Sequence, residues 1–336
     1  MITMKDIAKA CGVSTSLVSR IINKDETLKC RQETIDKVLK EIERTGYTPN
    51  TNARMLATNS LVSKRTIRIG YLTYKGVHGN SNLYFDNIAE GLSTIFLEEK
   101  FEVYKFYIDE VYAKYEKKEP LTSKILDGLV IFGTIPDNLY SYLKHQSKYI
   151  SCIYGKSFPN CDSVGTDINV SLNPMLSLIK EYGYEEVAFV YGGEEERIKH
   201  IKEYANSIGF TINETFSFDG GYNEVNAYEK ACILLKKYKP PKVICCLNDE
   251  MAIGIENALI EFGYNVPNDV SVTGHDDVYK ASYCKVPLTT IRIYKEEIGR
   301  LISDLLIERI TYFRKFPVNV IVPCEIVLRD SLKKNK

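Results

Sequence analysis

Three polar side chains with complementary hydrogen-bonding chemistry follow strand-like runs in the second half of the sequence. Asn248 comes directly after "VICCL", Asp276 follows "SVTGH", and Arg197 lies in a predicted helix after "AFVYGG". An amide, a carboxylate and a guanidinium can each hydrogen-bond two neighbouring hydroxyl groups, which is the chemistry of carbohydrate recognition. The alternative is that Asn and Asp cap the helices that follow such junctions. For Asp249 we expect capping.

Aromatic side chains offer a second kind of contact to the same ligand. Tyr222 in "DGGYNE" can stack on the apolar face of a sugar. If the fold has two lobes, Tyr84 or Phe85 can do so from the other lobe. Ligands of open parallel sheets bind beyond the carboxyl ends of the strands. The sequence therefore predicts a polar and aromatic small-molecule site.

Catalytic and metal-binding patterns are missing from the sequence. It has no G-x-G-x-x-G, H-E-x-x-H or G-x-S-x-G motif, and its four histidines are far apart. His275 beside Asp276 is the one suggestive pair, but a histidine at a strand end is more often structural. The nine cysteines form no C-x-x-C pair, which favours reduced thiols over disulfides or zinc. We expect no enzymatic activity, no metal and no cofactor.

The N-terminal stretch "KDIAKACGVSTSLVSRIIN" predicts two short helices separated by a turn at Gly12. Ser14 is placed to cap the second helix. The face of this helix that is not buried then carries short polar and basic residues, namely Thr15, Ser16, Ser19 and Arg20. Such a helix fits the major groove of DNA, where an Arg–guanine contact discriminates by about 1–3 kcal/mol. The alternative is a polar helix hairpin that only caps a domain.

A third helix, expected over about residues 31 to 45, closes a small core. It carries apolar residues at helical spacing, namely Ile35, Val38, Leu39 and Ile42.

The charge of the N-terminal part supports a polyanionic partner. Residues 1–68 hold 13 Lys and Arg against 7 Asp and Glu, while the whole chain is neutral.

The segment "NTNARMLATNS", residues 50–60, predicts a short conditional helix. Asn50 can cap a helix that ends near Thr58, but an isolated helix needs roughly 12–15 residues to be stable. We expect it to fold only when a partner organises it. Leu56 on such a helix can insert between base pairs from the minor groove. The alternative is an ordinary linker.

Beyond residue 67, apolar strand-like runs alternate with helical stretches. The first series is "TIRIGYL", "FEVYKFY", "DGLVIFG" and "YISCIY", and the second is "EEVAFVYGG", "PKVICCLND" and "DVSVTGHDD". The alternation predicts an α/β fold with two doubly wound parallel-sheet units.

The words "MKDIAKACGVS", "VSRIIN", "GYTPN", "NARMLA" and the closing "PCEIVLRDSL" resemble the lactose/galactose repressor (LacI/GalR) family of bacterial transcription regulators, over essentially the whole chain. The resemblance implies a helix-turn-helix DNA-binding domain at 1–48 and a hinge helix and linker at 49–66. It also implies a periplasmic-binding-protein-like core. Its N-lobe is formed by 67–161 plus 288–319, and its C-lobe by 162–287 plus 320–332.

The resemblance also implies roles for individual residues. Base or phosphate contacts are expected from Thr15, Ser16, Ser19, Arg20 and Asn23. Asn50 and Ala53 support the hinge, and Leu56 intercalates. Contacts to the effector, meaning the small molecule that regulates the protein, are expected from Arg197, Asn248 and Asp276, with stacking by Tyr84, Phe85 and Tyr222.

Five positions depart from the family's pattern. Arg31 replaces a small capping residue of the third helix, His200 and Ile201 replace a Gly followed by an aromatic residue, Ile293 replaces a polar contact and Tyr74 a small residue. These changes leave the effector open. A galactoside or similar sugar is our hypothesis, and a co-repressor or purine effector is the alternative.

We expect a homodimeric, sequence-specific repressor that binds a near-palindromic double-stranded DNA operator. The chain ends soon after its last predicted strand, which favours a dimer, and no run approaches the roughly 20 apolar residues of a membrane span. A sugar-binding transport protein would need an export signal, which the start of the sequence does not show. The expected location is the cytoplasm, in association with the nucleoid.

Overall fold

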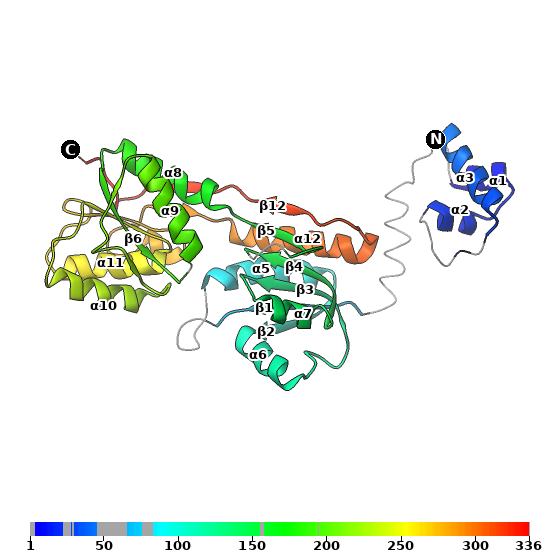
Figure 1. Cartoon of the computed structure of the whole chain (residues 1–336), viewed down its shortest axis with the longest axis horizontal. Coiled ribbons are helices and arrows are strands. Elements are labelled where there is room, and N and C mark those ends of the chain that lie inside the picture. Colours follow the sequence, from blue (N-terminus) through cyan, green and yellow to red (C-terminus); the bar gives the residue numbers. More distant parts are fainter. Residues whose placement is uncertain are drawn as a thin grey trace. The chain divides into compact units, whose positions relative to one another are not determined.

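The computed structural model describes residues 4–22, 28, 30–45, 66–75, 83–154, 158–193 and 195–335. The chain divides into two compact units, residues 1–66 and residues 67–336. We refer to them as the head and the core, and each is described by itself (Figure 1).

The described residues of the head form three helices, α1 (Met4–Cys11), α2 (Thr15–Ile22) and α3 (Gln32–Thr45). Gly12 has a φ of +69°, a conformation that glycine adopts without steric cost, and it turns the chain between α1 and α2. The Leu17 amide donates to Ser14 Oγ at 3.1 Å, so Ser14 caps α2 as predicted. The helical pair and its turn are therefore confirmed.

A small apolar core holds the three helices together. Its buried residues come from all three helices and are Ile7, Ala8, Cys11, Val18, Ile21 and Val38. Ile35 and Ile42 pack against this cluster from α3, as expected. Leu39 is 47% exposed, so its expected place in the core is wrong. It lies one position past Val38, which turns it away from the buried face of α3.

The first lobe of the core is built on a six-stranded sheet in the order β12-β5-β4-β3-β1-β2. All neighbouring strands are parallel. The strands are β1 (Arg68–Thr73), β2 (Glu102–Tyr107), β3 (Leu126–Phe132), β4 (Ser147–Ile153), β5 (Asp162–Gly165) and β12 (Asn319–Ile321). The helices of this lobe are α5 (Leu83–Glu98), α6 (Ile108–Lys117), α7 (Asp137–Leu143) and α12 (Lys295–Tyr312).

The second lobe has a five-stranded parallel sheet in the order β10-β9-β6-β7, with β8 also paired to β6. Its strands are β6 (Glu186–Tyr191), β7 (Thr211–Ile212), β8 (Phe218–Asp219), β9 (Val243–Cys246) and β10 (Ser271–Thr273). Its helices are α8 (Ile168–Glu181), α9 (Glu195–Ser207), α10 (Glu224–Leu235), α11 (Asp249–Glu261) and the short 3₁₀ helix η2 (Tyr279–Ser282). The predicted α/β fold with two parallel sheets is confirmed.

The chain crosses between the lobes three times, before α8, before α12 and after β12. The antiparallel pair of β11 (Thr290–Arg292) and β13 (Glu325–Val327) belongs to two of these crossings. The expected boundary between the two lobes, between residues 161 and 162, comes one strand too early. Strand β5, which begins at Asp162, belongs to the sheet of the first lobe. Similarly, the first-lobe return begins at α12 rather than at residue 288, because bridges from Thr289 and Arg292 join the second lobe.

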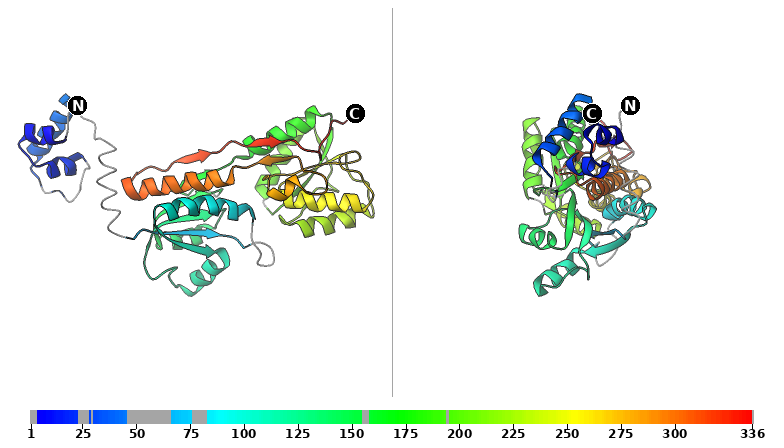
Figure 2. Two further views of the ribbon diagram at one scale, coloured as in Figure 1. Left: turned by 180° about the vertical axis from the view of Figure 1, so that it is seen from behind. Right: turned by 90° about the vertical axis from the view of Figure 1, so that its right-hand side faces the viewer.

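Helices α5 and α12 approach each other closely in the first lobe, as the view from behind shows (Figure 2). Two glycines permit this approach. A Cβ atom at Gly299 would lie 2.1 Å from the carbonyl oxygen of Ile88, and one at Gly91 would lie 2.1 Å from that of Glu296. Any larger residue at either position would push the helices apart.

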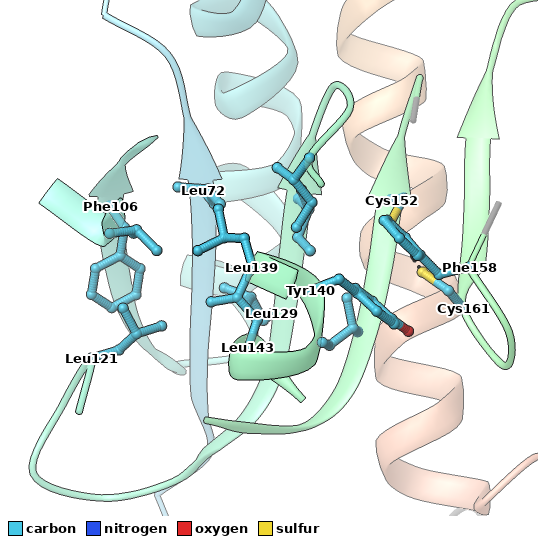
Figure 3. Close-up of a cluster of buried hydrophobic side chains, with 14 of the residues drawn as sticks. Leu72, Phe106, Leu121, Leu129, Leu139, Tyr140, Leu143, Cys152, Phe158 and Cys161 are labelled. Carbon is cyan, nitrogen blue, oxygen red and sulfur yellow. Dashed lines mark hydrogen bonds between the residues drawn. The ribbon is translucent and has the colours of Figure 1, made fainter. Parts of the chain in front are cut away.

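One face of the first sheet is covered by a buried apolar cluster (Figure 3). Tyr140 stacks on Phe158 with ring centroids 3.8 Å apart, and the thiols of Cys152 and Cys161 lie 3.1 Å apart beside them. All nine cysteines are free, and five of them are buried. No described helix is long and apolar enough to cross a membrane.

Candidate functional site

The polar residues predicted from the second-lobe strand ends form a connected wall. Arg197, in the first turn of α9, donates from Nη1 to the Tyr222 hydroxyl at 3.3 Å. Asn248, at the end of β9, donates from Nδ2 to the Tyr222 carbonyl at 3.4 Å. A Cβ atom at Gly192 would lie 2.2 Å from the Tyr222 ring, so the glycine after β6 leaves the space that this ring occupies. Tyr222 thus joins the two strand ends.

Asn248, and not Asp249, caps α11. The Met251 amide donates to Asn248 Oδ1 at 2.9 Å. The fully buried Asp249 instead accepts from the Val278 amide at 2.8 Å and from Thr290 Oγ1 at 2.5 Å. Burial raises the pKa of Asp249 well above its usual range. The expectation that Asp249 caps is wrong, because two distant partners hold its carboxylate in the interior.

Asp276 lies in the loop after β10, with a backbone φ of +111°. Its amide donates to the Ile291 carbonyl at 2.8 Å, its carbonyl accepts from Lys295 Nζ, and its Oδ1 lies 2.9 Å from His275 Nδ1. Non-glycine residues rarely adopt such a backbone conformation, and those that do are frequent at functional sites. The loop is therefore fixed by both neighbouring crossings rather than left mobile.

Aromatic side chains from the first lobe form a second wall. The Tyr84 ring lies 5.8 Å from that of Tyr154 and 5.3 Å from that of Phe85. Phe85 also stacks on Tyr74 at 5.5 Å and lies 5.8 Å from Phe132. Tyr84 therefore belongs to a cluster of aromatic rings, within which it contacts Tyr154 and Phe85.

Electrostatics link the two walls. Burial raises the pKa of Tyr84 well above its usual range; the nearby Tyr154 and Asp276 raise it further, and Arg197 opposes them. Tyr84, in α5 of the first lobe, is thus close enough to Arg197 and Asp276 for their charges to shift its pKa. These two residues follow β6 and β10 of the second lobe. Of the predicted residues, the structure links Arg197, Tyr222 and Asn248 through hydrogen bonds, and it places Arg197 and Asp276 within electrostatic range of Tyr84.

Two neighbouring residues were not predicted from the sequence. Tyr154 follows β4, and burial raises its pKa, which Asp276 raises too. The strand-end rule applied to the first sheet would have found it. Lys295 is 7% exposed and reaches Asp276 from the start of α12, and no local pattern distinguishes it from a surface lysine.

The arrangement can bind a small molecule rich in hydroxyl groups. It offers a carboxylate, a guanidinium and an amide on one side and aromatic faces on the other. No cluster of three or more metal-binding side chains occurs within the described residues.

In the head, α2 presents its small polar residues outward. Thr15 and Ser16 are exposed, Ser19 and Arg20 are half-buried, and Val18 and Ile21 are buried on the opposite face. The other predicted DNA-contacting residues, Asn23, Asn50, Ala53 and Leu56, lie outside the described residues.

Two family descriptions match separate parts of the chain. "Bacterial regulatory proteins, lacI family" matches residues 3–50, and "Periplasmic binding protein-like domain" matches residues 177–332. The HTH-type transcriptional repressor PurR of Vibrio parahaemolyticus serotype O3:K6 is 29% identical over 99% of both chains.

Solved structures share the fold. The transcriptional regulator CelR in complex with cellobiose superposes with a TM-score of 0.69 at 20% identity, covering 98% of this chain and 100% of that one. The Lac repressor dimer bound to operator and the anti-inducer ONPF gives a TM-score of 0.66 at 20% identity, covering 98% of both chains. The head thus matches the lacI family of bacterial regulatory proteins, the core matches the periplasmic binding protein-like domain, and the chain is similar over its whole length to a repressor with which it shares 29% identity.

Proposed function

We propose that this protein is a homodimeric transcriptional repressor that binds a near-palindromic operator and whose affinity for DNA is set by a sugar. The observation that carries the proposal is the joining, in one chain, of a head with an outward polar α2 to a core in which Arg197, Tyr222 and Asn248 are linked by hydrogen bonds, with Tyr84 within electrostatic range of Arg197 and Asp276. Such a regulator acts in the cytoplasm, where its DNA lies.

The head supports sequence-specific binding. Helix α2 carries short exposed side chains at its start, which allow its backbone to approach base edges in the major groove, and Arg20 can bind guanine. In the proposed complex, the segment around Leu56 folds against the minor groove, and two copies place their α2 helices in successive major grooves.

The core supports a polyhydroxylated effector. Asp276 and Arg197 provide charge-assisted hydrogen bonds, and the ring of Tyr84 provides the stacking surface that the apolar face of a pyranose needs. A planar purine is the second candidate, because the same aromatic wall of Tyr84, Phe85 and Tyr154 can stack on a base. The effector acts by binding one arrangement of the two lobes better than the other, so it shifts the population that binds DNA.

An exposed aromatic patch on the second lobe supports the dimer. Tyr279 and Tyr283 are 83% and 60% exposed, and their rings lie 4.8 Å apart. Val225 is 57% exposed and follows Glu224 in the chain. Glu224 forms an ion pair with Lys280 of η2, the short helix that also contains Tyr279. Large exposed apolar side chains grouped in this way are typical of a protein–protein contact. We propose that this patch meets its copy across a two-fold axis.

The first experiment is a selection from random double-stranded oligonucleotides with the full chain. We expect an enriched sequence with two similar half-sites. The Arg20→Ala variant should lose the preference at one position of each half-site, because it lacks the guanine contact. Enrichment of no sequence would contradict the repressor function.

The second experiment measures operator binding and thermal unfolding with D-galactose, D-ribose, cellobiose and hypoxanthine. We expect one of the sugars to raise the unfolding temperature and to change operator affinity. Arg197→Ala should abolish both effects while it leaves DNA binding without the sugar intact. A response to hypoxanthine alone would favour the purine alternative. An unchanged sugar response in Arg197→Ala would contradict the assignment of the site.

A further inference from the structure

His275 is a buried histidine that adjoins the acidic residue of the proposed effector site. Its Nδ1 lies 2.9 Å from Asp276 Oδ1, and the residue is 4% exposed. Its Nε2 is buried and has no hydrogen-bond partner among the residues that the structure describes. The proposed function uses Asp276 but gives this imidazole no role.

The surroundings of the ring select one protonation state. The Nδ1 atom faces a carboxylate oxygen at hydrogen-bond distance, so it must carry a proton to avoid placing two lone pairs against each other. A second proton on Nε2 would be a buried donor without a described acceptor, which is costly. Burial also lowers the pKa of His275, and the nearby Arg197 and Lys295 cations act in the same direction, against the Asp276 carboxylate, which raises it. The ring is therefore neutral, with its proton on Nδ1.

We propose that His275 is a positioning residue, whose Nδ1–H holds Asp276 Oδ1 so that Oδ2 accepts hydrogen bonds from the effector. The proposal rests on the proposed function, because it takes Asp276 as an effector contact.

A restraint on the Asp276 side chain matters because two cations lie near the adjacent His275. Arg197 and Lys295 are both close enough to influence His275, and Lys295 already binds the carbonyl of Asp276. The backbone of Asp276 is fixed by its amide bond to Ile291 and by the strained φ, but its side chain can still rotate about χ1 and χ2. A neutral donor on the adjacent residue fixes the carboxylate without neutralising its charge.

The first test is independent of any ligand. Long-range hydrogen–nitrogen correlation spectra of the ¹⁵N-labelled full chain distinguish the two neutral tautomers and the imidazolium, and the His275→Asn spectrum identifies the signals of His275. We expect a protonated Nδ1 and an unprotonated Nε2 at pH 7. A protonated Nε2 would overturn the proposal.

The second test uses two isosteric variants. In His275→Asn the amide nitrogen takes the place of Nδ1 and can still donate to Asp276, whereas in His275→Gln it takes the place of Nε2 and cannot. With D-galactose, D-ribose and cellobiose as probes, we expect His275→Asn to stay within roughly threefold of the wild-type affinity. His275→Gln should lose roughly tenfold or more, as expected for a lost hydrogen bond to a charged group.

Equal affinities of the two variants, or a greater loss in His275→Asn, would contradict positioning. Unfolding temperatures of both variants without sugar, and their binding to the selected operator, separate positioning from misfolding, and we expect both to match the wild type. Asp276→Asn tests the proposed effector site itself. If it binds the sugars as the wild type does, the proposed effector site is wrong, whatever the His275 variants show. If no probe binds the wild type, the tautomer measurement still decides the state of His275.

Discussion

Asp276 and Asp277 are consecutive residues with positive φ angles of 111° and 50°, yet their carboxylates have opposite kinds of partner. Asp276 lies beside a neutral histidine at the effector site. Asp277 accepts from Arg292 Nε at 2.7 Å and from Arg329 Nη2 at 2.6 Å. Because these arginines belong to β11 and to the segment after β13, Asp277 joins two crossings of the core to the loop that carries Asp276.

Asp277→Asn should therefore destabilise the core by about 2–4 kcal/mol, since it leaves the guanidinium of Arg329 without a carboxylate partner and that of Arg292 with Glu325 alone. Burial opposes ionisation of Asp277, but the hydrogen bonds from Arg329 and Arg292 outweigh it and lower its pKa. A lowered pKa stabilises the folded state above the unfolded pKa, and that stability is lost as the pH falls through the folded value. Urea unfolding should thus show the deficit at pH 7 and a smaller one near pH 3.

The matched control is Asp109→Asn. Asp109 accepts from Lys75 Nζ at 2.8 Å but is 59% exposed, so its loss should cost no more than about 1 kcal/mol. If both variants lose the same free energy of unfolding, the link between the crossings contributes no more than a surface ion pair.

Gly299→Ala should destabilise the first lobe although alanine is the better helix former by about 1 kcal/mol. The added Cβ would lie 2.1 Å from the Ile88 carbonyl oxygen of α5, so the helices must separate, at a cost of about 1–3 kcal/mol or more. Thermal unfolding should show a lower midpoint. Gly193→Ala is the control, because a Cβ there meets nothing within 4 Å. A higher midpoint for Gly299→Ala would mean that α5 and α12 are not held this close in solution.

The strand-end positions of the site residues were predictable, because parallel strands bring their carboxyl ends to one edge and Arg197, Asn248 and Asp276 follow recognisable apolar runs. The division of roles between Asn248 and Asp249 was not. Both can cap a helix, and the choice is made by distant partners of Asp249 such as Thr290, which no local pattern reveals.

Some strands were missed for a related reason. The sequence of β5, "DSVG", has a single apolar residue, and its Asp162 is held by Arg314 from beyond α12. Strands β7 and β8 are two residues long, which is too short to show a period. These elements form because the fold supplies their partners, so a reading of local sequence cannot find them.

Leu56→Ala tests the predicted hinge, which lies outside the described residues. Removal of the side chain that inserts between base pairs should weaken operator binding strongly, by tenfold or more on the scale of about 1.4 kcal/mol per decade, because the kinked DNA loses its wedge. Sugar binding and dimer formation should not change. Fluorescence anisotropy with the selected operator, calorimetry and sedimentation measure the three properties. Leu61→Ala, in the same segment, is the control, and an equal loss of all three properties in Leu56→Ala would indicate a folding role instead.

Glu256→Gln should make the second lobe more stable in neutral solution. Glu256 is fully buried in α11, its Oε1 accepts from the Val286 amide at 2.8 Å, and burial raises its pKa to about 6. The folded pKa lies above the unfolded value of 4.5, so between these two pH values the folded state binds more protons than the unfolded state. The free energy of unfolding therefore falls as the pH rises from 4.5 to about 6.

The neutral glutamine keeps the acceptor for Val286 and avoids this penalty. We expect a gain of about 1–2 kcal/mol in the free energy of unfolding at pH 8 and almost none at pH 4. Glu229→Gln, at an exposed position of α10, should show no such difference between the two pH values. A gain in Glu256→Gln that is independent of pH would show that the carboxyl group does not titrate as its buried position requires. A loss at pH 8 would show that the ionised form makes a stabilising contact that the amide cannot replace.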